Sequence, residues 1–481
     1  MKVFNTLSGK KEEFVPQSDE VRMYVCGVTP YDDSHIGHAM SYVIFDVIRR
    51  YLHFSGYRVK YVQNITDIDD KLIDRAVKYG SSVSELAEKF TASYFEDMDA
   101  LNVGRADVYP RATGEIDKML EVIRGLIDRG YAYPSAGSVY FRVSSVSDYG
   151  KLSHRSLESM AAGCNVEFSG EKEHPLDFVL WKAAKPDEPW WDSPWGRGRP
   201  GWHIECSAMA LKYLGDTIDI HGGGQDLVFP HHENEIAQSE SFTGKRPFVK
   251  YWLHNGMVQF GDEKMSKSLG NLITIKDALA NYSADAIRIF ILNSHYRSPL
   301  TYLEESFEVA EKAADRLRQA AVGDFGGDRG DGEIDVDAYR SQFVCAMDDD
   351  FNTARALAVL FDLAREINRA AELGYRVMPA REILLELAGI LGLTLKPLER
   401  PAVDTGLLAE VRDDVYRELG RPVSTMAEQT AEELVEELIQ VRDELRRARR
   451  WQPADMIRDR LDEAGIYLED TPGGTTPRYR R

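Results

Sequence analysis

The chain is poor in cysteine and in basic side chains, and it contains no long hydrophobic run. Four cysteines in 481 residues do not make a disulfide framework, so each is expected to be a buried side chain, a metal ligand or a reactive thiol. No stretch approaches the ~20 apolar residues of a membrane span, and no apolar leader segment begins the chain. We therefore expect a cytoplasmic protein that has no membrane contact.

Acidic side chains outnumber basic ones by 79 to 59, which gives a formal net charge of −20. This excess argues against indiscriminate nucleic-acid binding, although it allows one basic face on an acidic body. A hydrophobic fraction of 43% with 10% aromatic residues is typical of a soluble globular protein. The chain length corresponds to roughly three or four domains.

The first part of the chain has the pattern of an α/β fold. Residues 21–28 are typical of a buried strand, residues 34–55 have apolar side chains at helical spacing, and residues 58–65 predict a second strand. This succession indicates a parallel sheet with a right-handed crossover. Strand patterns return at DTIDIHGGG and YWLHNGMVQF, beyond a less regular segment at about 110–200, and the pattern is mostly helical from about residue 275.

These patterns predict an α/β Rossmann-like catalytic domain split by a connecting insertion, followed by an all-helical domain and a small C-terminal module. The predicted parts are residues 1–115 and 201–274 for the catalytic halves, 116–200 for the insertion, 275–320 for a helical region, 334–400 for a helical bundle and 401–481 for the C-terminal module. A Gly/Asp-rich linker occupies residues 321–333, and a helix is expected to begin near Asp350 or Asn352.

The segment YDDSHIGH places two histidines at the predicted start of the first long helix. His35 and His38 are three residues apart and face the same side. Gly37 permits close approach of a nucleotide, and the free N–H groups of a helix N-terminus favour an anion such as a triphosphate. Imidazoles beside a phosphate donate hydrogen bonds to charge that develops during the reaction. Taken alone, the pair is more typical of surface or capping histidines on an amphipathic helix.

A second motif, GDEKMSKSLGN, follows a predicted strand. Lys264 and Lys267 are three residues apart in a Gly- and Ser-rich loop, where they can clamp the β- and γ-phosphates of a nucleotide. Alone, this motif is also consistent with a solvated basic loop. In this order and at this separation, the two motifs resemble the paired signature of the class I aminoacyl-tRNA synthetases.

A third group of residues has the chemistry of a zinc site. Cys26 ends the first strand, Cys206 lies in GWHIECSAM, and His231 and Glu235 lie four residues apart on a predicted helix face. Two thiolates, an imidazole and a carboxylate are suitable zinc ligands. The spacing is not that of a zinc finger, and a core cysteine beside a solvated helix face is the alternative. Cys164 and Cys345 belong to no motif and are expected to be buried spectators.

Over nearly its whole length the chain resembles one class I family, the cysteinyl-tRNA synthetases. The resemblance is carried by YVCGVTPYDDSHIGHA, QNITDIDDKLI, GWHIECSAM, DIHGGGQDLVFPHHENEIAQ, GDEKMSKSLGN, DDDFNTARALAVLFDLAREINR and AGIYLEDTPGGTT. It departs at Met40-Ser41, where the family usually has Arg-Thr. The resemblance implies ATP-dependent activation of L-cysteine to cysteinyl-adenylate, release of pyrophosphate, and transfer to the 3′ end of tRNA(Cys).

The resemblance also implies roles for individual residues. One zinc ion per chain would be held by Cys26, Cys206, His231 and Glu235 and would bind the substrate thiolate, which lets the site reject serine without editing. Thr66, Trp202 and His221 would line the cysteine pocket. Gly222, Gly223, Gly224 and Asp226 would approach the nucleoside, and His35, Gly37, His38, Lys264 and Lys267 would contact ATP, which binds with Mg²⁺.

For the rest of the chain, the resemblance implies a monomer in which residues 275–320 contact the tRNA stem, residues 334–400 bind tRNA and residues 401–481 bind the anticodon. Arg446, Arg447, Arg449, Arg450 and Trp451 suit phosphates and unpaired bases. Two alternatives share the catalytic motifs. One is the cysteine–amino-sugar ligase of mycothiol synthesis, which does not need the C-terminal third. The other is a non-catalytic paralogue that binds tRNA or senses zinc.

Overall fold

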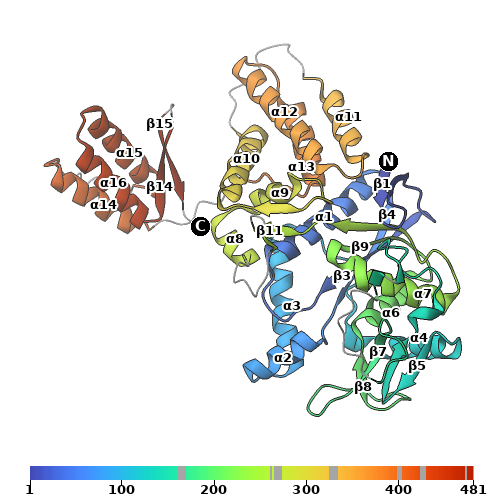
Figure 1. Cartoon of the computed structure of the whole chain (residues 1–481). Helices are drawn as coiled ribbons and strands as arrows, with labels where there is room; N and C mark the ends of the chain where they lie inside the picture. The colour runs from blue at the N-terminus through green and yellow to red at the C-terminus, as the bar shows by residue number, and fades with distance from the viewer. Residues whose placement is uncertain are drawn as a thin grey trace. The chain divides into compact units, whose positions relative to one another are not determined.

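The computed structural model describes residues 1–157, 159–160, 170–260, 263–264, 273–323, 334–397, 404–422, 429–471 and 474–479. The chain forms two compact units, Met1–Leu395 and Lys396–Arg481, each with its own hydrophobic core (Figure 1). None of the helices in these described ranges is both long enough and apolar enough to cross a membrane.

A four-stranded sheet forms the centre of the N-terminal unit. It contains β3 (Glu20–Val28), β4 (Arg58–Ile65), β9 (Ile218–Gly224) and β10 (Val249–Asn255) in the order β10-β9-β3-β4, and all three pairings are parallel. Helix α1 (Ile36–Phe54) connects β3 to β4, so the predicted strand–helix–strand unit and the Rossmann-like fold class are confirmed.

Alternating side chains of β3 face two different cores, as the twofold repeat of a strand requires. Met23 and Val25 belong to the core that includes the buried residues of α1. Tyr24 and Cys26 belong to a second core, which includes buried residues of α6 (Trp202–Leu214). Cys26 is therefore held against α6, on the opposite side of the sheet from α1.

The connecting segment is more regular than its sequence indicates. After α2 (Asp70–Tyr79), α3 (Val83–Ala100), a short 3-10 turn (Ala112–Gly114) and α4 (Ile116–Asp128), the chain builds a second four-stranded sheet. Its strands are β5 (Ala132–Ser135), β6 (Ser138–Phe141), β7 (Phe178–Ala183) and β8 (Gly198–Pro200), all antiparallel, with a 3-10 turn at Val143–Ser145. The strands are only three to six residues long, so their alternation is too brief to see in sequence.

The segment YWLHNGMVQF does not remain in one sheet. Strand β10 ends at Asn255, and β11 (Val258–Phe260) joins a separate sheet with β12 (Glu263–Lys264) and β13 (Leu300–Tyr302). The break contains Gly256, where a Cβ atom would lie 2.1 Å from the carbonyl oxygen of Ser298. Glycine is thus required by the close approach of two backbone segments.

Helices follow, as predicted. They are α8 (Ile275–Asn281), α9 (Ala284–Leu292), α10 (Glu304–Val322), α11 (Val336–Met347), α12 (Thr353–Glu372) and α13 (Met378–Ile390). Asn352 caps α12, because its side chain accepts a hydrogen bond from the N–H of Arg355. An N-terminal hairpin, β1 (Lys2–Asn5) and β2 (Lys10–Glu13), bridges to Asp349 just before this helix. Cys345 on α11 is exposed, so the expectation that it is buried is wrong; Cys164 lies outside the described residues.

The C-terminal unit contains α14 (Thr405–Glu418), α15 (Ala431–Arg447) and α16 (Trp451–Glu463), followed by an antiparallel hairpin of β14 (Ile466–Thr471) and β15 (Gly474–Tyr479). Leu408, Leu438 and Ile457, one from each helix, are buried in its core. Trp451, at the start of α16, is 57% exposed.

Candidate active site

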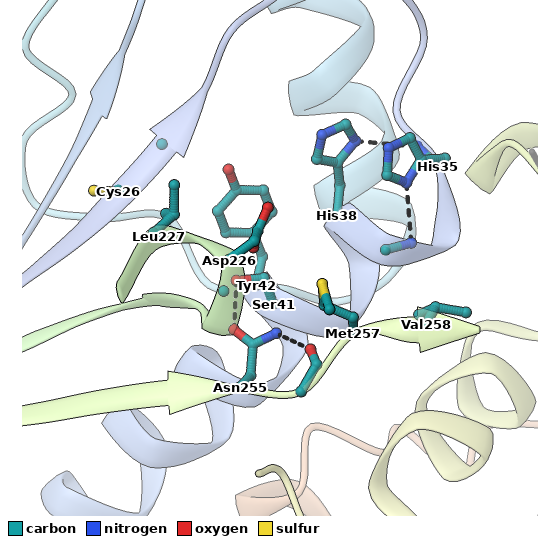
Figure 2. A pocket seen from close by; sticks show the side chains of 14 residues that line it. Cys26, His35, His38, Ser41, Tyr42, Asp226, Leu227, Asn255, Met257 and Val258 are labelled. Atoms are coloured by element: carbon teal, nitrogen blue, oxygen red, sulfur yellow. Dashed lines mark hydrogen bonds between the residues drawn. The ribbon is translucent and has the colours of Figure 1, made fainter. Parts of the chain in front are cut away.

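A cavity of about 310 Å³ opens where β3, β9 and β10 end (Figure 2). Its lining includes Cys26 and Gly27 from β3, and Gly224 and Asp226 at and just after the end of β9. It also includes residues 255–258, which run from the last residue of β10 to the first residue of β11. His35, Gly37, His38, Ser41 and Tyr42 complete it from the start of α1. The carboxyl ends of parallel strands are where open α/β sheets bind ligands.

The two histidines at the start of α1 cap the helix with their own rings. The N–H of Gly37 donates to Nδ1 of His35 at 3.1 Å, and the N–H of His35 donates to Nδ1 of His38 at 3.2 Å (Figure 2). The rings stack with centroids 3.9 Å apart. A Cβ atom on Gly37 would lie 2.9 Å from the His35 ring, so this glycine is required by the cap itself.

This arrangement determines which ring nitrogens carry hydrogen. Burial lowers the pKa of His35, and burial together with the neighbouring His35 lowers the pKa of His38 well below its usual value. Both imidazoles are therefore neutral near pH 7 and carry one ring hydrogen each. Since both Nδ1 atoms accept hydrogen bonds, the hydrogens are on the Nε2 atoms. The cavity thus has two Nε2–H donors beside a helix N-terminus, an arrangement that favours an anionic ligand.

The three glycines at the end of β9 have different surroundings. Gly224 and Asp226 both line the cavity. A Cβ atom on Gly224 would lie 2.5 Å from the Asp226 carboxylate. Gly222 instead packs on the Phe45 ring of α1, where a Cβ would lie at 2.2 Å, and a Cβ on Gly223 would lie 2.8 Å from Leu227. These two glycines are thus required by packing inside the fold.

Ser41, at the departure from the family pattern, and Asn255, which the sequence did not single out, also line the cavity. The Ser41 hydroxyl donates to Oδ1 of Asn255 at 3.0 Å, and Nδ2 of Asn255 donates to the carbonyl of Gly256 at 2.8 Å (Figure 2). These bonds orient the Asn255 amide between β10 and α1. Asn255 carried no motif signal, because its partner Ser41 is more than two hundred residues away in sequence.

Of the two motif lysines, only Lys264 is within the described residues, as backbone of β12 paired with Gln259; Lys267 is outside them. The chain that follows the motif is fixed to the start of α1. The N–H of Ile36 donates to the carbonyl of Ile273 at 3.0 Å, and the N–H of Ile275 donates to the carbonyl of Ser34 at 2.9 Å. These two backbone hydrogen bonds join the segment that follows the lysine motif to the segment that contains the histidine motif.

Next to the cavity, a buried cluster unites the four residues expected to bind zinc. The Cys26 and Cys206 sulfurs are 3.8 Å apart, and the Cys26 sulfur lies 3.7 Å from Oε1 of Glu235. Nε2 of His231 lies 3.0 Å from the same carboxylate oxygen. Cys206 is on α6, His231 is in a single helical turn (Val228–His232), and Glu235 is on α7 (Glu233–Thr243). All four side chains are buried.

The groups of this cluster have strongly shifted acidities. A hydrogen bond from Cys26 lowers the pKa of Cys206 to about 6, whereas burial raises the pKa of Cys26. Burial raises the pKa of Glu235, but the charges of His221 and His231 outweigh it and lower that pKa to about 2. One thiolate and one carboxylate are therefore favoured within this buried cluster even without an ion.

His232 is a member of the cluster that sequence reasoning did not select. Its Nε2 lies 3.2 Å from the Cys26 sulfur, and Cys26, His231, His232 and Glu235 all have ligand atoms within 4.8 Å of one another. Its Nδ1 lies 2.8 Å from Nε2 of His254, whose Nδ1 lies 2.7 Å from the Thr6 hydroxyl. His254 comes from β10 and Thr6 follows β1, so no local pattern could indicate this chain of contacts.

The three residues expected around the substrate lie beside the cluster. The Trp202 ring stacks on His231 with centroids 4.3 Å apart, although Trp202 is 41% exposed. Nε2 of His221 lies 2.9 Å from Oε2 of Glu235. The Thr66 hydroxyl accepts a hydrogen bond from Asn64. An exposed ring over a buried donor set can cover a small ligand there.

The chain matches known families along most of its length. Residues 13–312 match the class I (C) tRNA synthetase catalytic domain, and residues 342–396 match the DALR domain. A cysteine–tRNA ligase of Dehalococcoides mccartyi is 57% identical over 476 residues, which cover 99% of this chain and 98% of that one. Another, from Thermodesulfovibrio yellowstonii, is 50% identical over 499 residues and 99% of both chains.

Solved structures share the fold at low identity. A Mycobacterium tuberculosis methionyl-tRNA synthetase in complex with methionyl-adenylate superposes with a TM-score of 0.55 at 18% identity, over 78% of this chain and 88% of that one. The Agrobacterium radiobacter LeuRS in its ternary complex with tRNA and LeuAMS gives a TM-score of 0.54 at 12% identity, over 80% and 85%. At these identities the likeness extends to the fold alone.

Proposed function

The chain belongs to the cysteine–tRNA ligases, a family of class I aminoacyl-tRNA synthetases, and we propose how its site joins cysteine to tRNA. The carboxylate of L-cysteine attacks the α-phosphorus of ATP and pyrophosphate leaves. The 3′-terminal hydroxyl of tRNA(Cys) then attacks the carbonyl carbon of the cysteinyl-adenylate, and AMP leaves. No residue has to form a covalent bond, so catalysis is positioning and stabilisation of charge. The observation that supports this most directly is the sequence identity along the full chain.

ATP with Mg²⁺ occupies the cavity at the strand ends in this proposal. The Nε2–H groups of His35 and His38 donate to the triphosphate as negative charge develops in the transition state. Asp226 accepts hydrogen bonds from the ribose hydroxyls, and the Gly224 backbone lies against the nucleoside. Lys264 and Lys267 contribute positive charge to the leaving pyrophosphate.

Cys26, Cys206, His231 and Glu235 suit a zinc ion in their chemistry, and the two sulfurs also have a suitable separation. Two thiolates at about 2.3 Å from a tetrahedral zinc are about 3.8 Å apart, and the two sulfurs here are 3.8 Å apart. Zinc held by these residues would bind the substrate sulfur as a thiolate, which a serine hydroxyl cannot replace. Trp202, His221 and Thr66 surround that position and exclude water from it.

Cys206 and His232 compete for the fourth ligand position, and we assign it to Cys206. A thiolate is a strong zinc ligand, and the Cys206 sulfur already has a lowered pKa. His232 has both ring nitrogens engaged, one by Cys26 and the other by His254. It therefore serves better as a donor to the Cys26 thiolate than as a ligand.

The partners of the reaction are L-cysteine, ATP and tRNA(Cys). We propose that residues 275–320 contact the tRNA stem, that the bundle at 334–400 binds tRNA, and that 401–481 binds the anticodon. The matched DALR domain at residues 342–396 supports the middle assignment. The protein is proposed to act as a cytoplasmic monomer.

The test is ATP-dependent attachment of labelled amino acid to total tRNA, with pyrophosphate exchange measured in parallel. Cysteine is expected to be attached. Serine is expected to be at least about 10⁴-fold poorer in kcat/KM, because serine has no thiolate for the zinc to bind. If cysteine drives exchange but never reaches tRNA, the amino-sugar ligase becomes the better assignment. If cysteine drives neither reaction, the active-site proposal fails.

A further inference from the structure

Tyr24 has a buried hydroxyl that no part of the proposed mechanism uses. The residue is fully buried on β3, two positions before Cys26, and its hydroxyl has no hydrogen-bond partner among the described residues. Polar groups buried without a partner are rare in folded proteins and call for an explanation. A neighbouring thiol that becomes an anionic acceptor when it binds a metal would explain such a hydroxyl.

The hydroxyl lies beside the proposed zinc ligands. Tyr24 and Cys26 share a face of β3, and Tyr24 pairs in register with His221 of β9, with ring centroids 5.1 Å apart. Tyr24, Cys26 and Cys206 are buried in the same core, which includes residues of α6. The Tyr24 side chain therefore lies on the same side of the sheet as both cysteines.

Each anionic ligand of the proposed set needs a hydrogen-bond donor, because the site is buried. Two have one. Nε2 of His232 lies 3.2 Å from the Cys26 sulfur, and Nε2 of His221 lies 2.9 Å from the Glu235 carboxylate. Two thiolates and a carboxylate around a divalent ion carry a net charge of −1, and the substrate thiolate makes it −2. The third anion, Cys206, therefore needs a donor as well.

The neighbours of Cys206 do not supply one. Its sulfur lies 3.7 Å from Oδ1 of Asn64, which is an acceptor and already receives the N–H of Gly27 at 2.8 Å. Its contacts with Cys26 and His231 are to fellow ligands, which are engaged by the ion when the metal is bound. In that state Cys206 is an anion without a donor among the described residues, next to a hydroxyl without an acceptor.

We propose that Tyr24 is a positioning residue of the metal centre, and that its hydroxyl donates to the Cys206 thiolate when the metal is bound. The inference rests on the proposed zinc set. The hydrogen bond stabilises the thiolate and fixes its direction toward the ion, as outer partners of metal ligands do. Together, Tyr24, His232 and His221 give each anionic ligand one donor.

The experiment replaces Tyr24 by phenylalanine in the full-length protein and measures zinc affinity by competition with a chelator. Loss of the donor is expected to weaken zinc binding about 10–100-fold. With Co²⁺ in place of zinc, the thiolate-to-metal charge-transfer band is expected to shift. Tyr51→Phe is the matched control, because this buried tyrosine donates to Asp348 at 2.6 Å, away from the cluster. It should change neither readout.

Unchanged zinc affinity and an unchanged cobalt band in Tyr24→Phe would overturn the inference. So would a higher KM for cysteine with the metal readouts unchanged, because the hydroxyl would then serve the substrate. Cys206→Ser separates this result from failure of the zinc proposal. If it releases zinc while Tyr24→Phe changes nothing, only the inference on Tyr24 fails. If it leaves zinc and the cobalt band unchanged, the ligand set fails and the inference falls with it.

Discussion

His35 and His38 cap the start of α1 and also line the cavity. Each Nδ1 receives a backbone N–H at the start of α1, and this leaves each Nε2–H directed away from the backbone. Burial lowers the pKa of both rings, so both are neutral near pH 7. In each ring Nδ1 therefore remains the acceptor in the cap and Nε2 remains the donor. The donors are thereby fixed in place before any ligand arrives, which is the condition for electrostatic stabilisation of a transition state.

His38→Asn tests this at the scale of a single residue. The asparagine amide oxygen can replace Nδ1 in the cap, but the distal donor is lost. Cysteine-dependent pyrophosphate exchange is expected to fall about 10²–10³-fold, the usual cost of one preorganised donor, with an unchanged melting temperature. His53→Asn, an exposed histidine in the last turn of α1, is the control and should leave the rate unaltered. A His38→Asn enzyme of normal rate would show that this imidazole makes no contact with the transition state.

At the scale of elements, a buried ion pair is one of the contacts that join the helical region to α1. Arg288 on α9 donates to Asp46 on α1 at 2.7 Å, and both side chains are buried. The same guanidinium donates to the carbonyl of Leu391 at the end of α13 and to that of Leu101 at the end of α3, both at 3.0 Å. The charge thus meets the negative ends of two helices as well as a carboxylate.

Arg288→Met is therefore expected to lower the free energy of unfolding by about 3–5 kcal/mol, because it leaves Asp46 buried with less compensation. The comparison is Arg340→Met, which removes an exposed ion pair with Glu386 and should cost less than about 1 kcal/mol. Urea unfolding of both variants measures the difference. Equal, small effects would mean that water or Arg50, which also donates to Asp46, compensates for the lost guanidinium.

Local patterns predicted what depends on neighbours in sequence. The start of α1, the strands β3 and β4 that flank it in the chain, and the Asn352 cap each depend on residues close together in sequence. The sequence predicts all of them. The four candidate zinc ligands were indicated by their chemistry and by a family resemblance, and the fold brings them together. The Thr6–His254–His232 contacts, the Ser41–Asn255 bond and the orphan Tyr24 hydroxyl were missed, because they join strands and helices that only the sheet order brings together.

At the scale of the whole molecule, the candidate site occupies only part of the chain. The cavity and the Cys–His–Glu cluster lie entirely within Met1–Leu395, a compact unit. The C-terminal unit has a separate core of its own. We therefore expect formation of the adenylate to need only the first unit, and binding of tRNA to involve both units.

A chain that ends at Leu395 is expected to keep cysteine-dependent pyrophosphate exchange near the full-length rate. Its kcat/KM for tRNA should fall about 10–100-fold, since a base stacked on an aromatic side chain contributes about 1–3 kcal/mol. Trp451→Ala in the full-length protein, which removes one exposed ring, should reproduce part of that loss and leave exchange intact. Because exchange and charging are read on the same sample, a misfolded truncation would lose both. Undiminished charging by the short chain would instead place tRNA recognition wholly in the first unit and remove the reason for assigning the anticodon to the second.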